Sequence, residues 1–225
     1  MNLPFNCSGI AIRGFPRSGS HLIRQILYYR FGLQSRYKRV ARSDNPVEFD
    51  RSWEGTDNSP GCRVVYSHEG LDPSIAATVM YVHRDGRAAY VSLSHFLRDF
   101  FPTAWPAPGL LERLIRGTLP NSNWSTHVRN GMNTEPVGGK VVVSFADMVR
   151  APERVVAQWA ECLDLAPQPC TKQPTFAEMH ARYPKFIRHG NDTGWRQEWS
   201  DALQALFLDI HGEMFRALGY SETWE

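Results

Sequence analysis

Four short apolar, partly β-branched runs stand out along the chain. They show little alternation of apolar and polar positions, which is typical of strands covered on both faces. The predicted strands are residues 8–15, 63–68, 77–84 and 140–145.

Between these runs the apolar positions recur with helical spacing. Pro152 suits the first turn of a helix, and Gly219 suits the position after a helix end. Alternating strands and helices predict an α/β fold with a central parallel sheet flanked by helices, which binds ligands at the carboxyl ends of its strands. The predicted helices are residues 21–31, 87–101, 110–116, 123–132, 152–163 and 201–218.

Two segments, 35–61 and 97–109, lack a regular pattern over most of their length, and the second contains the aromatic, Pro-rich run FFPTAWPAPG. Long loops in a compact domain are often functional lids. We therefore expect one domain over residues 1–225, with a lid or acceptor loop at each segment. Disorder is the alternative for the first segment.

Composition is that of an ordinary soluble globular protein, with 42% hydrophobic and 21% charged residues. A net charge of +2 gives no indication of nucleic acid as a partner. Cys7, Cys62, Cys162 and Cys170 are scattered without zinc-type spacing, which favours a reducing, cytoplasmic location. We recognise no signal peptide and no run of apolar residues that would span a membrane.

The stretch GFPRSGSHLIRQIL has the layout of a phosphate-binding loop between a strand and a helix. It lacks the usual GxxxxGK[ST] pattern, and Arg17 precedes the glycine. Backbone N–H groups and the helix N-terminus favour an anion there, Gly19 permits close approach, and Ser20 offers a hydroxyl. An N-capped turn with a solvated arginine is the alternative.

Two further segments carry groups that bind anions. Arg84 ends the third predicted strand, and Ser92 lies on the following helix. Arg188, His189 and Gly190 form a third cluster. The tripeptide RHG also occurs in histidine phosphatases, but only 35 residues follow it, too few for their catalytic domain.

The order and spacing of these segments resemble those of the sulfotransferases that use 3′-phosphoadenosine 5′-phosphosulfate (PAPS), especially the cytosolic type. Within that family the chain resembles a small bacterial member. The family's PKSGTTW corresponds to residues 16–22, its VxRNPKDVxVSxxHF to residues 82–96 and its RKGxxGDWK to residues 188–196. The stretch KVVVSFADMVRAPERVVAQWAECLDL is similar to the family's strand and helix around YEDM, and TFAEM at 175–179 to its TSFKEM. The resemblance runs from about residue 10 to residue 199.

The resemblance implies a catalytic base and a cationic group at the leaving oxygen. The family's base is a histidine in a KTH segment, which His68 matches, and a histidine titrates near neutral pH. Arg17 stands at the family's lysine and would act electrostatically, because an arginine does not readily donate its proton.

The resemblance also implies a cofactor site for PAPS and its product, adenosine 3′,5′-bisphosphate (PAP), with no metal. Phe176 would stack on adenine. Leu22 stands where the family has the second stacking tryptophan, so Trp195 or another aromatic side chain would take that place. The residues implied for the 5′-phosphosulfate are Arg17, Ser18, Gly19, Ser20 and His21, and those for the 3′-phosphate are Arg84, Ser92, Arg188, His189 and Gly190.

These residues predict in-line transfer of a sulfuryl group to a hydroxyl or amine of a small-molecule acceptor, natural-product or lipid-like. Phe96, Phe100, Phe101 and Trp105 are candidate walls of the acceptor pocket, with core packing as the alternative. A P-loop kinase and an inactive nucleotide-binding protein are the rival functions. The family's KxxxTVxxxE dimer motif is not evident, so the oligomeric state is open.

Overall fold

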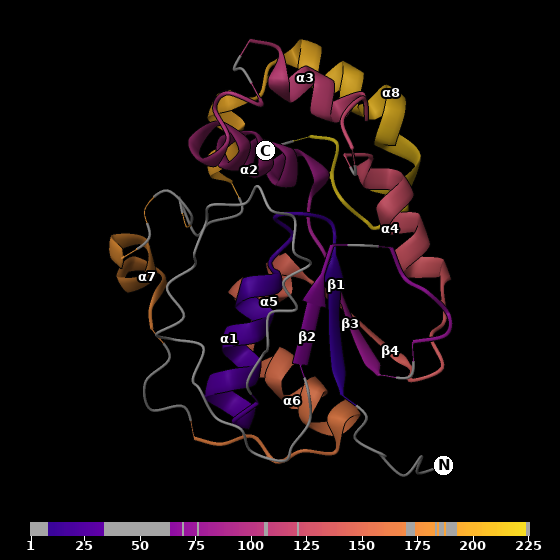
Figure 1. The fold of residues 1–225 in the computed structure, drawn as a ribbon, viewed down its shortest axis with the longest axis vertical. Coiled ribbons are helices and arrows are strands. Elements are labelled where there is room, and N and C mark those ends of the chain that lie inside the picture. Colours follow the sequence, from indigo (N-terminus) through magenta and orange to yellow (C-terminus); the bar gives the residue numbers. More distant parts are fainter. Residues whose placement is uncertain are drawn as a thin grey trace. The chain divides into compact units, whose positions relative to one another are not determined.

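A computed structural model, shown in Figure 1, describes the chain at residues 9–33, 64–68, 70–75, 77–105, 108–120, 122–169, 174–182, 184, 187 and 193–223. The predicted loop at 35–61 lies outside these residues. The chain divides into two compact units. The first is Met1–Gly14, Gly19–Val82 and Thr134–Gln173, and the second is Phe15–Ser18, His83–Asn133 and Pro174–Glu225.

The first unit is built around a four-stranded sheet, as the sequence predicts. Its order is β2-β1-β3-β4, and β1 pairs in parallel with both β2 and β3. Ile10 of β1 is the partner of Val64 on one side and of Thr78 on the other. The strands are β1 (Ile10–Gly14), β2 (Val64–Ser67), β3 (Thr78–His83) and β4 (Lys140–Ser144).

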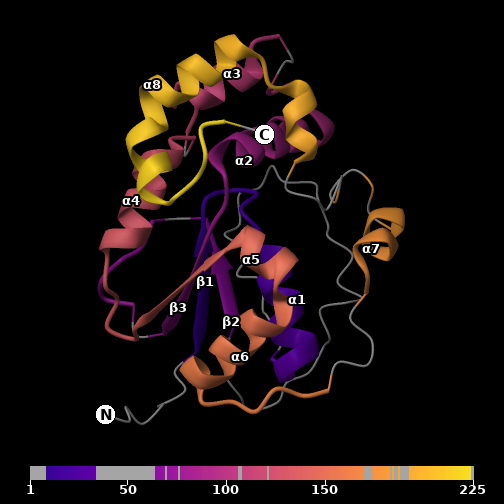
Figure 2. The same cartoon turned by 180° about the vertical axis from the view of Figure 1, so that it is seen from behind.

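In the described residues of the first unit, three helices accompany this sheet, and the two views in Figures 1 and 2 show them together alongside the strands. They are α1 (Ser20–Phe31), α5 (Phe145–Arg150) and α6 (Pro152–Leu163). Helix α5 was not predicted, because six residues are too few to show a helical period. Apolar side chains of the strands and helices form one core, in which Ile12, Ile23, Leu27, Met80 and Trp159 are fully buried.

The second unit is helical in its described residues. It contains α2 (Gly86–Phe100), α3 (Leu110–Ile115), α4 (Trp124–Asn133), α7 (Phe176–Arg182), the 3-10 helix η2 (Gly194–Glu198) and α8 (Asp201–Ala217). Helix α8 packs against α3 and α4, and η2 against α2. Four of these helices match the predicted ranges to within one residue at each end, while α7 and η2 were not predicted. Within the described residues no helix is long and apolar enough to cross a membrane.

The core of the second unit encloses a histidine. His211 of α8 is fully buried and packs against Phe207 and Trp124. Its Nε2–H donates to the carbonyl oxygen of Ile115 at 2.9 Å, and its Nδ1 is hydrogen-bonded to Ser125 Oγ at 2.8 Å. Burial lowers the pKa of His211 to about 4, against 6.5 for an exposed imidazole. The neutral form therefore joins α3, α4 and α8.

The lowered pKa of His211 predicts that the protein loses stability as the pH is lowered. Because its pKa is lower in the folded than in the unfolded chain, the unfolded chain binds the proton first, and stability is lost as pH falls from about 6.5 to about 4. The loss attributable to His211 should reach about 3 kcal/mol. Denaturant unfolding at pH 7 and pH 4 measures it. His211→Gln should flatten the difference, and an equal difference in both proteins would contradict the assignment.

Candidate functional site

The loop between β1 and α1 runs through residues 15–19 and bends sharply. Ser18 N–H donates to the carbonyl oxygen of Phe15 at 3.1 Å, and Arg17 has a positive φ of 68°. Gly19 has a φ of 113°, and a Cβ there would lie 2.6 Å from the Phe145 ring. Only a glycine fits this position, because a side chain there would both strain the left-handed backbone and meet the Phe145 ring.

The start of α1 has the electrostatics of an anion site. Gly19 precedes the helix with no side-chain cap, and the first turn contains no acidic residue. Ser20 is buried. Ser18 is fully buried as well, and its hydroxyl has no hydrogen-bond partner among the described residues. A buried hydroxyl normally has a partner, so an anion bound by this loop would satisfy it.

The second unit brings together four of the predicted residues. Arg17 Nε donates to Ser92 Oγ at 3.1 Å. The Arg17 guanidinium lies 5.2 Å from the centre of the Phe96 ring. Arg84 Nη1 donates to the carbonyl oxygen of Arg17 at 3.3 Å. Two arginines and a hydroxyl from three segments of the chain are therefore in contact with one another.

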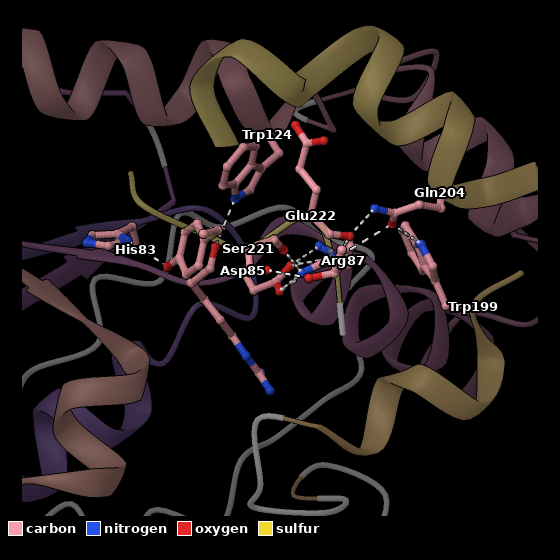
Figure 3. Close-up of polar contacts among 11 residues, drawn as sticks. His83, Asp85, Arg87, Trp124, Trp199, Gln204, Ser221 and Glu222 are labelled. Carbon is pink, nitrogen blue, oxygen red and sulfur yellow. Dashed lines mark hydrogen bonds and ion pairs between the residues drawn. The ribbon is translucent and has the colours of Figure 1, made fainter. Parts of the chain in front are cut away.

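Arg84 stands in a turn that its neighbours hold in place, and Figure 3 labels three of these neighbours, His83, Asp85 and Trp124. Trp124 Nε1 donates to the carbonyl oxygen of Arg84 at 3.2 Å, and His83 Nδ1 lies 2.8 Å from the hydroxyl of Tyr220. The carboxylate of Asp85 accepts from the Arg87 N–H at 2.9 Å and so caps α2. The backbone on both sides of Arg84 is thus fixed by side chains from α2, α4 and the end of the chain.

Arg87 fastens the end of the chain to this turn, a role that the sequence did not reveal. Its side chain is 4% exposed and donates to Asp85 at 2.8 Å and to the carbonyl oxygen of Ser221 at 2.9 Å (Figure 3). Its guanidinium lies between the rings of Trp195 and Phe215, at 4.6 and 4.5 Å from their centres. The one local indication is an aspartate two residues before an arginine at a helix start.

The first unit holds the predicted base. His68 follows β2, and its Nδ1 lies 2.8 Å from the carbonyl oxygen of Gly14, at the end of β1. The hydroxyl of Tyr66 is hydrogen-bonded to its Nε2. His21, predicted for the cofactor, packs its ring 6.0 Å from that of Tyr66. Both ring nitrogens of His68 are therefore engaged.

The candidate acceptor walls belong to one aromatic cluster of the second unit. The Phe96 ring lies 4.9 Å from Phe100 and 5.9 Å from Phe101. Trp105 is half-buried against the same core. Residues 97–100 of the predicted loop at 97–109 are the last turn of α2. These side chains are partly exposed, so core packing and contact with a ligand are compatible.

The remaining predicted residues are only partly described. Phe176 starts α7 and stacks on His180, with ring centres 6.2 Å apart. Trp195 is buried beneath Arg87. Arg188, His189 and Gly190 lie outside the described residues.

Asp147, just after β4, makes structural contacts at the start of α5. Asp147 N–H donates to Ser144 Oγ at 3.0 Å, and Asp147 Oδ1 accepts from Arg154 at 2.5 Å. The described parts of the chain contain no group of three His, Cys, Asp or Glu side chains that could hold a metal ion.

A family model described as "Sulfotransferase domain" matches residues 8–219, which run through both units. No curated protein matches the chain. Among solved structures, a mouse sulfotransferase complexed with PAP has a TM-score of 0.72 and 15% identity, with 94% of this chain and 84% of that chain covered.

A second similar structure is retinol dehydratase in complex with androsterone and the inactive cofactor PAP. It has a TM-score of 0.69 and 14% identity, with 96% of this chain and 82% of that chain covered. At such identities the likeness concerns the fold.

Removing the Arg87 side chain should destabilise the protein strongly. Arg87→Ala leaves Asp85 and the carbonyl oxygens of Ser221 and Glu222 without their cation, which should lower the free energy of unfolding by about 3–5 kcal/mol. Arg216→Ala is the matched control, because Arg216 forms an exposed ion pair with Glu222 worth at most about 1 kcal/mol. Urea unfolding measures both, and equal losses would contradict a structural role for the buried arginine.

Proposed function

Because the chain belongs to the sulfotransferase domain family, we propose that it transfers the sulfuryl group of PAPS to a small-molecule acceptor. The observation that carries the proposal is the convergence of Arg17, Arg84 and Ser92 within one unit. These are the residues that the family's motifs assign to the two ends of the cofactor. The similar structures contain PAP, which supports the same cofactor for this chain.

The loop at 15–19 and the start of α1 would bind the 5′-phosphosulfate. Arg17 contributes a fixed positive charge, and Ser18, Gly19, Ser20 and His21 contribute hydroxyl and backbone donors. The buried Ser18 hydroxyl supports this assignment, since a bound oxyanion would satisfy it. PAPS supplies the sulfuryl group when bound, and PAP leaves.

Arg84 and Ser92 would bind the 3′-phosphate, together with Arg188, His189 and Gly190. Ser92 also accepts a hydrogen bond from Arg17, so the residue assigned to the 3′ end touches the residue assigned to the 5′ end. A phosphate that engages Ser92 would change the contacts of Arg17, which couples occupancy of the two ends. Phe176 would stack on adenine, as the resemblance implies.

His68 would act as the base for the acceptor's hydroxyl or amine. The carbonyl oxygen of Gly14 can only accept a hydrogen bond, so Nδ1 of the neutral imidazole carries the proton and Nε2 has the lone pair. Nε2 would take up the acceptor's proton, and Arg17 would stabilise the negative charge that develops on the leaving oxygen.

The aromatic cluster around Phe96 suits an apolar acceptor that carries a hydroxyl group. Among the similar structures, retinol dehydratase was crystallised with androsterone and, in another complex, with retinol. Sterol- and terpenoid-like alcohols are therefore the first acceptors to test, followed by aromatic amines. A compound of this class would place its apolar body against Phe96, Phe100, Phe101 and Trp105 and present its hydroxyl for transfer.

Cofactor binding can be tested by thermal unfolding with PAP and, separately, with ATP and magnesium. PAP at a hundredfold excess over its dissociation constant should stabilise the protein by about 2.7 kcal/mol, a rise in Tm of roughly 5–10 °C. Arg84→Ala should abolish the rise, whereas Arg116→Ala, which removes an exposed arginine, should keep it. A rise with ATP and magnesium but none with PAP would indicate a kinase instead.

The base is tested by His68→Ala. With an acceptor that the screen has identified, turnover should fall about 10²–10⁴-fold, the usual contribution of a positioned base. The rise in Tm with PAP should persist, because His68 is not assigned to the cofactor. Sulfated product is quantified by mass spectrometry, and turnover within a few-fold of wild type would exclude His68 as the base.

A further inference from the structure

Tyr66 lies on β2 two residues before His68, and its side chain meets that of the predicted base. The Tyr66 hydroxyl is hydrogen-bonded to His68 Nε2, the nitrogen that would accept the acceptor's proton. The two rings are nearly perpendicular, at 81°, with centres 4.8 Å apart. The Tyr66 hydroxyl therefore occupies the hydrogen-bonding position of Nε2, through which a proton would reach this nitrogen.

The direction of this hydrogen bond follows from the other ring nitrogen. Nδ1 lies 2.8 Å from the carbonyl oxygen of Gly14, which has no proton to give. Nδ1 must therefore carry the proton of the neutral imidazole, and Nε2 can only accept. The Tyr66 O–H is consequently the donor. In the resting protein the lone pair of His68 Nε2 therefore accepts a hydrogen bond from the Tyr66 phenol.

The Tyr66 ring is held on several sides. His21 of α1 packs at 6.0 Å from its centre, and the Arg24 guanidinium lies over its face at 6.0 Å. The ring also packs against the core of the first unit. Swinging the phenol away from Nε2 would break these contacts. A tyrosine fixed in this way is suited to pass a proton to Nε2 rather than to move aside.

We propose that Tyr66 relays the acceptor's proton to His68, an inference that rests on the proposed sulfotransferase function. The acceptor's hydroxyl donates its proton to the Tyr66 oxygen while Tyr66 gives its own proton to Nε2. The acceptor oxygen forms its bond to sulfur with the electron pair released, and the bond between sulfur and the leaving oxygen breaks. Tyr66 ends neutral, and His68 ends as an imidazolium that donates to Gly14 and Tyr66.

Kinetics of Tyr66→Phe test the relay, since the variant keeps the ring and its packing. The relay predicts that kcat falls about 10–100-fold while the Kd for PAP is unchanged. In a His68→Ala background the same substitution should change kcat by less than about twofold, because the two residues act as a unit. Unchanged or raised kcat in Tyr66→Phe would show that the phenol only caps the base, and would overturn the proposal.

The pH profile adds a readout that a purely structural role would not move. Replacing Tyr66 by 3-fluorotyrosine makes the phenol more acidic, so the alkaline limb of kcat should move to lower pH. The titratable and charged groups described around the phenol are His68, His21 and Arg24, and none of these is altered. An alkaline limb at the same pH in both proteins would exclude proton transfer through Tyr66.

Nitrogen-15 NMR of the histidine rings separates this proposal from the proposed function, because it needs no turnover. Tyr66→Phe should shift the His68 Nε2 resonance and leave Nδ1 protonated, whereas Tyr28→Phe on α1 should shift neither. If wild type forms no sulfated product but Nε2 responds, the sulfotransferase proposal fails and the Tyr66–His68 pair stands. If Nε2 does not respond, the relay is wrong whatever the activity.

Discussion

The backbone of Gly14 is the constraint on which the first unit depends. β1 lies between β2 and β3, and a Cβ at Gly14 would be 2.6 Å from the carbonyl oxygen of Val82. A glycine is therefore needed for the two strands to approach at their carboxyl ends. The carbonyl oxygen of the same residue accepts the Nδ1 proton of His68. The missing Cβ of this residue permits close packing of the sheet, and its carbonyl oxygen sets the tautomer of the candidate base.

Arg87 differs from Arg17 and Arg84, the other arginines described above for the second unit, in the partners that surround its guanidinium. Arg87 is buried with a carboxylate, backbone carbonyls and two aromatic rings around it, so its charge is balanced within the protein. The contacts described for Arg17 and Arg84 are with a hydroxyl, a ring and a carbonyl oxygen. Arg87 supports the turn in which Arg84 stands, because it binds the neighbouring Asp85.

The sequence predicted the sheet well because buried parallel strands leave uninterrupted apolar runs. It also assigned Arg17, Arg84 and Ser92 to the cofactor, Arg17 at its 5′ end and the other two at its 3′ end, but it did not indicate that Arg17 Nε donates to Ser92 Oγ. It could not show that Arg87 binds the carbonyl of Ser221, because the two residues are 134 positions apart and carbonyls have no sequence signature. The sequence gives no signal for the role of Tyr66 either, because a tyrosine in a strand usually packs against neighbouring side chains. Helices α5, α7 and η2 are too short for a period to be recognised.

Two departures from the family's motifs have related chemical consequences. Arg17 replaces a lysine in the phosphate loop, and Tyr66 stands where the KTH segment has its lysine. Each lysine could shift its pKa and exchange a proton, whereas an arginine stays charged and a phenol stays neutral near pH 7. Proton movement would then fall to Tyr66 and His68 alone, and charge stabilisation to Arg17. Separate residues would then act on the two groups: Tyr66 and His68 would move the acceptor's proton, and Arg17 would keep its positive charge at the leaving oxygen.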